Sequence, residues 1–69
     1  MSTSTYTVNG MTCEHCVNSV REEVGGLAGV TAVDIDLGSG RLDVTADSPV
    51  SDDAVRAAVE EAGYHLAAN

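Results

Sequence analysis

Two cysteines lie three positions apart in the segment NGMTCEHCVNSV, residues 9–20, and the chain has no others. A Cys-x-x-Cys pair serves as a disulfide, a dithiol redox couple, half of a zinc site or a two-thiolate site for a softer metal. The thiolate is the form that binds a metal or attacks a disulfide. Cys13 and Cys16 are therefore the candidate site residues, and the four chemistries must be separated.

Two of these chemistries, and a buried structural pair, are disfavoured by the residues around the cysteines. A structural zinc site takes four ligands, but His15 lies between the cysteines and His65 is expected on a distant last strand. A thioredoxin-type redox pair belongs to a larger domain and usually follows an aromatic residue, whereas Met11 and Thr12 precede the first cysteine. The polar neighbours of both cysteines also argue against a buried, purely structural pair.

Copper(I) fits the pair better. It is a soft ion that prefers thiolates and accepts as few as two or three ligands. Two sulfurs on a loop can hold it and leave one side open, so that a thiol from a partner can bind before an original bond breaks. The pair therefore predicts a site that transfers its metal.

Composition limits the other functions. Sixty-nine residues, 43% of them hydrophobic but none Trp or Phe, indicate one small domain over residues 1–69. A core of this size leaves little room for a deep substrate pocket, which argues against an enzyme. Eleven acidic residues against three arginines give a net charge of −8, which disfavours nucleic acid and anionic membranes. A basic protein surface is the natural partner.

The chain is expected in the cytoplasm. Its first ten residues, MSTSTYTVNG, have neither the basic region nor the apolar run of a secretory signal. No stretch approaches the roughly 20 apolar residues of a membrane span. In a reducing cytosol a stable disulfide is disfavoured, which again favours metal chemistry for the pair.

Periodicity predicts the elements around the cysteines. Residues 5–10 alternate as a short strand, and a helix is expected from residue 14 until the glycines of residues 25–29. Cys16 would then lie in the first turn of this helix, where unpaired N–H groups favour the thiolate. The apolar stripe of the helix consists of Val17, Val20, Val24 and Leu27.

The remaining chain predicts a hairpin, a second helix and a last strand. Residues 30–37 and 41–46 alternate around a Gly-Ser-Gly turn. Ser51 is the expected N-cap of a helix that ends at Gly63, and residues 64–68 form a last strand. The order βαββαβ indicates an α+β fold, with a four-stranded antiparallel sheet and two helices on one of its faces. The inward side chains of the hairpin would be Val33, Ile35, Leu37, Leu42, Val44 and Ala46.

Three segments resemble the heavy-metal-associated domain family. They are GMTCEHC at residues 10–16, GVTAVDIDLGSGRLDV at residues 29–44 and AVEEAGY at residues 58–64. The likeness extends over residues 6–66 and is greatest to the freestanding bacterial copper chaperones of the family. It implies a ferredoxin-like sandwich in which Cys13 and Cys16 bind copper(I) and pass it to the metal-binding domains of a copper-exporting P-type ATPase.

The same resemblance implies roles for three neighbouring residues. Met11 matches the methionine that braces the loop from the core, and Tyr64 matches a tyrosine that lies near the metal in many bacterial members. His15 departs from the small or polar residues common between the cysteines. It is interpreted as a charge that tunes the thiols near neutral pH, as a ligand for a second copper in a dimer, or as a solvated spacer.

Several rival interpretations stay open at this point. One is a mercury(II)-binding or other soft-metal module, and another is a regulatory domain detached from a transporter. A third, from a different class, is a small dithiol oxidoreductase that needs no copper. A copper-responsive repressor as an additional partner and a copper-bridged homodimer are compatible with an exposed thiolate pair.

Overall fold

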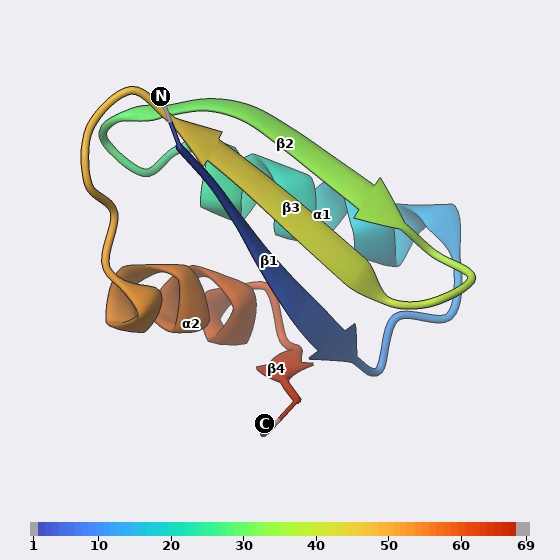
Figure 1. Ribbon diagram of the computed structural model, residues 1–69. Coiled ribbons are helices and arrows are strands. Elements are labelled where there is room, and N and C mark those ends of the chain that lie inside the picture. Colours follow the sequence, from blue (N-terminus) through green and yellow to red (C-terminus); the bar gives the residue numbers. More distant parts are fainter. Residues whose placement is uncertain (1, 68–69) are drawn as a thin grey trace.

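The computed structural model describes residues 2–67 and has two layers, a four-stranded sheet and a pair of helices (Figure 1). The sheet has the strand order β2-β3-β1-β4, and each neighbouring pair is antiparallel. This is the ferredoxin-like βαββαβ arrangement, so the predicted α+β fold is confirmed. The elements are β1 (Ser2–Asn9), α1 (Glu14–Gly25), β2 (Val30–Asp36), β3 (Arg41–Ala46), α2 (Asp52–Glu61) and β4 (His65–Leu66).

The core lies between the sheet and the two helices. β3 is a central strand, and its inward side chains are buried as the alternation predicts. Both helices turn a valine-rich stripe toward these side chains of the sheet, because apolar residues spaced three or four positions apart share one face of a helix. The central cluster consists of Val8, Val20, Val24, Leu42, Val44, Val55, Ala58 and Val59.

β2 behaves differently from β3, although both strands alternate. Val33 and Ile35 pair with the buried Val44 and Leu42 and so face the core as predicted. They are nevertheless only half-buried, as is Leu37 just beyond the strand. The reason is the strand order, because an edge strand has a neighbour on one side alone.

The first strand is longer than its hydrophobic pattern predicts, since it begins at Ser2 rather than near residue 5. Its early residues are small and hydroxylated, and they pair with β3 through polar side chains. Thr3 and Thr45 share a hydrogen bond of 3.1 Å between their hydroxyls, and the hydroxyl of Thr5 donates to Asp43 at 2.8 Å. Cross-strand polar pairs of this kind stabilise a sheet without an apolar pattern.

Two other boundaries also differ from the predictions. α1 ends at Gly25, and Leu27 reaches the core from the turn that follows, where its N–H donates to Val24 at 3.1 Å. β4 contains only His65 and Leu66, so Tyr64 precedes the strand. The predicted extension of this strand to residue 68 lies outside the described residues.

The second helix begins at the predicted cap. The hydroxyl of Ser51 accepts a hydrogen bond of 3.1 Å from the N–H of Ala54. Ser51→Ala is expected to lower the free energy of unfolding by about 1 kcal/mol, because it leaves that N–H without its partner. Urea denaturation of the reduced protein measures the loss. Ser2→Ala, an exposed change at the start of β1, should leave the midpoint unchanged; equal effects in the two variants would contradict the capping role.

Candidate metal centre

The loop between β1 and α1 starts with a turn that requires glycine. Gly10 has a φ of +96°, in the left-handed region that other residues avoid. A Cβ placed on Gly10 would lie 3.3 Å from Cδ1 of Tyr64, so the tyrosine ring packs directly on the backbone here. The residues that follow β1 therefore contact the Tyr64 ring as the chain enters the cysteine loop.

Cys13 occupies the N-cap position of α1. Its backbone is extended, and its carbonyl accepts the first helical hydrogen bonds, from the N–H groups of Cys16 at 3.1 Å and Val17 at 3.3 Å. Its side chain makes no capping hydrogen bond. The backbone of Cys13 therefore starts the helix while its thiol stays available.

The structure brings the two thiols together, as the spacing predicts. Both cysteines are free, Cys13 exposed and Cys16 half-buried, with 3.5 Å between their sulfurs. A disulfide would hold the sulfurs at about 2.05 Å. A metal–thiolate bond is about 2.3 Å long for an ion such as zinc, so one ion can contact both sulfurs at this separation. The geometry is that of an open two-sulfur site.

The two thiols differ in acidity. The pKa of Cys16 is lowered to about 6. Hydrogen bonding from the backbone of Thr12 is the largest cause, followed by hydrogen bonding from the Tyr64 hydroxyl, while partial burial opposes both. The pair thus holds one thiolate at neutral pH before any ion binds, and a thiolate is the metal-binding form.

Thr12 is the residue of the site that sequence reasoning missed. Besides its backbone, its hydroxyl lies 3.9 Å from the sulfur of Cys16, within reach of a weak hydrogen bond. The one signal in the sequence was its position next to the N-cap. At the start of a helix, backbone N–H groups lack helical partners and can donate to a nearby side chain.

Tyr64 and Cys16 influence each other, because the thiolate also raises the pKa of the tyrosine hydroxyl. Tyr64→Phe keeps the ring over Gly10 and removes the donor, so the pKa of Cys16 is expected to rise from about 6 toward the ordinary thiol range. The rate of Cys16 alkylation as a function of pH measures it. Tyr6→Phe is the matched control, because the Tyr6 hydroxyl donates to Asp52 instead. Identical pH profiles for wild type and Tyr64→Phe would contradict this role.

The structure places the other candidate residues as follows. Met11 is half-buried and packs against the core, in keeping with a bracing role. His15 is exposed on the first turn of α1. His65 is an exposed residue of β4, as expected, and its Nδ1 lies 4.0 Å from a carboxylate oxygen of Glu60. Within residues 2–67 no three His, Cys, Asp or Glu side chains lie close enough together to hold a metal ion.

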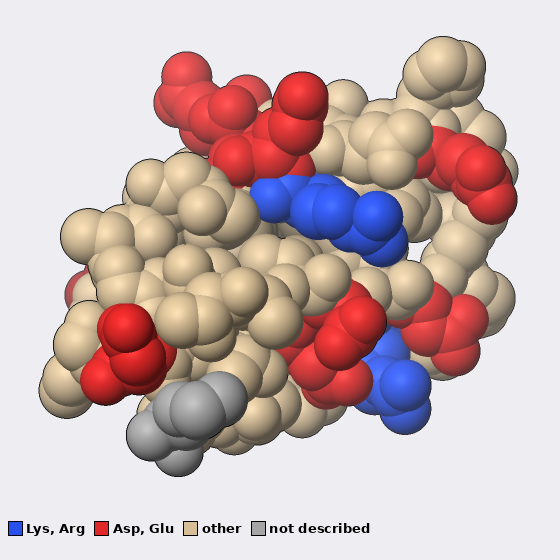
Figure 2. All heavy atoms as spheres, turned by 90° about the horizontal axis from the view of Figure 1, so that it is seen from above, with Lys and Arg blue, Asp and Glu red and all other residues tan. Residues whose placement is uncertain are grey.

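Most charged side chains of the protein are acidic, with eleven Asp and Glu against three Arg. Figure 2 shows one face of the molecule, on which separate patches of acidic side chains and a few basic ones lie among uncharged residues. In the described part of the chain, no helix is both long enough and apolar enough to cross a membrane.

Comparison with known proteins decides the family. The sequence matches the heavy-metal-associated domain over residues 5–65. This chain belongs to the heavy-metal-associated domain family. The resemblance seen in the sequence is therefore confirmed, and the family match includes the whole loop that carries the two cysteines.

Three relatives within the heavy-metal-associated family are informative. The chain is 43% identical over 68 residues to the copper chaperone CopZ of Bacillus subtilis (strain 168), covering 97% of this chain and 99% of that protein. It is 37% identical over 57 residues to a copper-transporting ATPase of Saccharomyces cerevisiae, covering 83% of this chain but 6% of the ATPase. A solved structure of a CopZ metallochaperone matches with a TM-score of 0.90 at 33% identity, covering 96% of this chain and 100% of that one.

Proposed function

We propose that this protein is a copper(I) chaperone that binds its cargo through Cys13 and Cys16 and transfers it by ligand exchange. The observation that carries the proposal is the pair of free thiols, 3.5 Å apart and open on one side. A soft ion is held well by two thiolates, whereas a harder ion needs more ligands than this site has. The full-length likeness to a copper chaperone supports the same function.

The difference between the two thiols suggests the order of events. Cys16 is a thiolate at neutral pH and half-buried, so it forms the first bond to an arriving ion and the last bond to break. Cys13 is exposed, so it closes the site during binding and opens it during release.

Transfer follows as a balanced exchange of ligands. A thiol of the acceptor loses its proton and bonds to copper(I), giving an ion with three sulfur ligands. The bond to Cys13 then breaks, and this sulfur takes up a proton. A second acceptor thiolate displaces Cys16 in the same way. Copper keeps its oxidation state throughout, so no electron donor is required.

The acceptor in this proposal is the metal-binding domain of a copper-transporting P-type ATPase. The likeness to a segment of such an ATPase supports it, since two domains of one fold can present matching thiol loops to each other. A net charge of −8 favours an acceptor with a basic face, and it makes the encounter rate fall with rising salt. The role is that of a carrier rather than an enzyme, and the requirement for reduced thiols places it in the cytoplasm.

Copper binding should depend on pH in a defined direction. Protons compete with the metal for a thiolate. Because the folded protein holds the pKa of Cys16 near 6, the proton penalty at this sulfur is small above that pH and grows as the pH falls through it. The affinity for copper(I) is therefore expected to fall more steeply with decreasing pH below about pH 6, where binding also has to release a proton from Cys16. An affinity that is constant from pH 5 to pH 8 would contradict this acid–base assignment.

The direct test is an anaerobic titration of the reduced protein with copper(I) in competition with a coloured copper(I) chelator. One ion per monomer is expected, bound far more tightly than zinc(II) in a parallel titration. A protein that leaves copper(I) with the chelator, or that prefers zinc(II), would refute the proposal. A mercury(II) titration under the same conditions tests the broader soft-metal alternative.

The lowered pKa of Cys16 also suits a second function, a dithiol oxidoreductase, because a thiolate attacks disulfides. That function predicts turnover of a disulfide substrate such as insulin by catalytic amounts of the metal-free protein. The copper carrier predicts reduction of no more than one disulfide per protein.

A further inference from the structure

The open edge of the sheet at β2 carries apolar side chains that the fold leaves half-covered. β2 is bonded to β3 on one side only, so its other side presents unpaired backbone N–H and C=O groups. Val33, Ile35 and Leu37 stay half-buried along this edge, whereas Val44 and Leu42, the β3 partners of Val33 and Ile35, are buried. A strand added here would complete both the hydrogen bonding and the burial.

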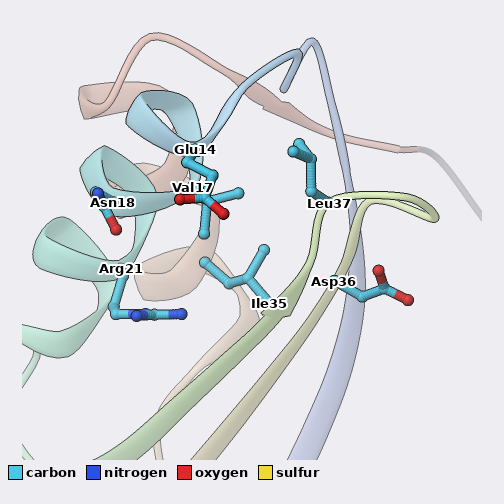
Figure 3. A pocket seen from close by; sticks show the side chains of 7 residues that line it. All are labelled: Glu14, Val17, Asn18, Arg21, Ile35, Asp36 and Leu37. Atoms are coloured by element: carbon cyan, nitrogen blue, oxygen red, sulfur yellow. The ribbon is translucent and has the colours of Figure 1, made fainter.

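Two hollows lie along the same edge, between β2 and α1. The first, of about 280 Å³, lies beside residues 35–37, and Figure 3 shows Val17 and Arg21 of α1 directed toward Ile35 in it. The second, of about 200 Å³, lies beside residues 30–33. Arg21 lines both hollows. The edge therefore offers two hollows, each with apolar side chains of β2 in its lining and with Arg21 between them. The first hollow is the more polar one, because Glu14, Asn18 and Asp36 also line it.

Arg21 differs from the other two arginines of this acidic chain. Arg41 lies 3.3 Å from a carboxylate oxygen of Asp43, and Arg56 lies 3.7 Å from one of Asp53. No ion pair of the described residues includes Arg21. An unpaired guanidinium between two hollows that each contain apolar side chains is complementary to a carboxylate that is itself flanked by apolar side chains.

The spacing of the hollows defines the segment that would fit. Their lining residues on β2 are centred about four positions apart, or roughly 15 Å at the rise of a strand. Side chains at positions i, i+2 and i+4 of an added strand point to the same face. The apolar groups thus belong at i and i+4 and the carboxylate at i+2. The side chain at i−1 points to the opposite face of the sheet, where Asp34 and Asp36 are exposed, which favours a basic residue at that position.

A second copy of this chain is a poor occupant of the edge. Each copy carries a net charge of −8. Pairing two β2 edges would also bring Asp34 and Asp36 of both copies onto one exposed sheet face, and Figure 3 shows the Asp36 side chain directed away from α1. Repulsion between these carboxylates opposes self-association.

We propose that the β2 edge is a second binding site, which accepts an extended segment of another protein as an antiparallel strand with the pattern basic-apolar-x-acidic-x-apolar. The backbone of β2 supplies the affinity, and the two hollows with Arg21 supply the selectivity. The site does not include Cys13 or Cys16, so it binds with or without copper. It gives the protein a means of docking to a partner that is separate from metal exchange.

The test uses the reduced, metal-free, full-length protein labelled with nitrogen-15 and the capped peptide KVTDTVT, whose two valines and aspartate have the required spacing. Saturable shifts are expected in the amides of residues 30–36 and around Arg21, and not at β4, the opposite edge. A peptide with asparagine in place of the aspartate should bind about tenfold more weakly, because its contact with the guanidinium loses the charge.

Variants of the protein complete the test. Arg21 is exposed, so Arg21→Gln should fold normally and should bind KVTDTVT about tenfold more weakly. Arg56→Gln, a change at an exposed arginine of α2, should bind it as wild type does. The proposal is overturned if no peptide saturates the β2 amides, if Arg21→Gln binds equally well, or if the same amides shift with protein concentration alone, which would indicate a second copy at this edge.

Discussion

Replacing either Cys13 or Cys16 by serine is expected to weaken copper(I) binding by a factor on the order of 10³ or more, because a hydroxyl is a poor ligand for a soft ion. Each cysteine supplies one of two sulfurs in a site where no further His, Cys, Asp or Glu of the described residues converges on them. Competition with a copper(I) chelator under anaerobic conditions gives the affinities.

Ser19→Ala is a suitable control for these variants. Ser19 lies on the same helix, and its hydroxyl donates to the carbonyl of His15 rather than to a sulfur. Both cysteine variants should remain folded, because Cys13 is exposed and serine is nearly the size of cysteine. A folded Cys13→Ser protein with wild-type copper affinity would show that the ion binds elsewhere.

Leu42→Ala is expected to lower the free energy of unfolding by about 3 kcal/mol, the largest loss among the variants proposed. Leu42 is fully buried in the central strand β3, between Tyr6 of β1 and Ile35 of β2. Its truncation leaves a cavity. Because β3 is hydrogen-bonded to a strand on each side, the backbone cannot move inward to fill it. The total free energy of unfolding of a protein is only about 5–15 kcal/mol. The midpoint of urea denaturation of the reduced protein should therefore fall sharply.

Leu37→Ala provides the comparison, since the same atoms are removed from a half-buried position beside the edge strand. Its expected cost is about 1 kcal/mol, because part of this side chain is already in contact with water. Equal losses in the two variants would show that the core is not centred on β3 as described here.

The helices and the hairpin could be predicted from the sequence because their apolar residues recur at the period of the element. The start of β1 could not, because its pairing with β3 depends on Ser and Thr side chains rather than on an apolar pattern. The half-burial of Val33 and Ile35 was also missed. It depends on the strand order, which alternation within a single strand does not contain.

The candidate site was predictable to a similar degree. The spacing of Cys13 and Cys16 and their position at a helix start indicated a pair of accessible thiols, and the structure brings them together. The difference in acidity between them was not predictable. It depends on Thr12 and on Tyr64. Tyr64 lies 48 positions beyond Cys16 in the sequence, and the fold brings it next to the cysteine loop.

The most direct test of the chaperone function is the rate of copper(I) transfer from the loaded protein to an isolated metal-binding domain of a copper-transporting ATPase. Ligand exchange through a shared intermediate predicts a rate that rises with acceptor concentration and exceeds the rate of copper release to a chelator that cannot dock. A transfer rate that is independent of acceptor concentration and equal to spontaneous release would contradict it, because copper would then pass through water rather than from thiol to thiol.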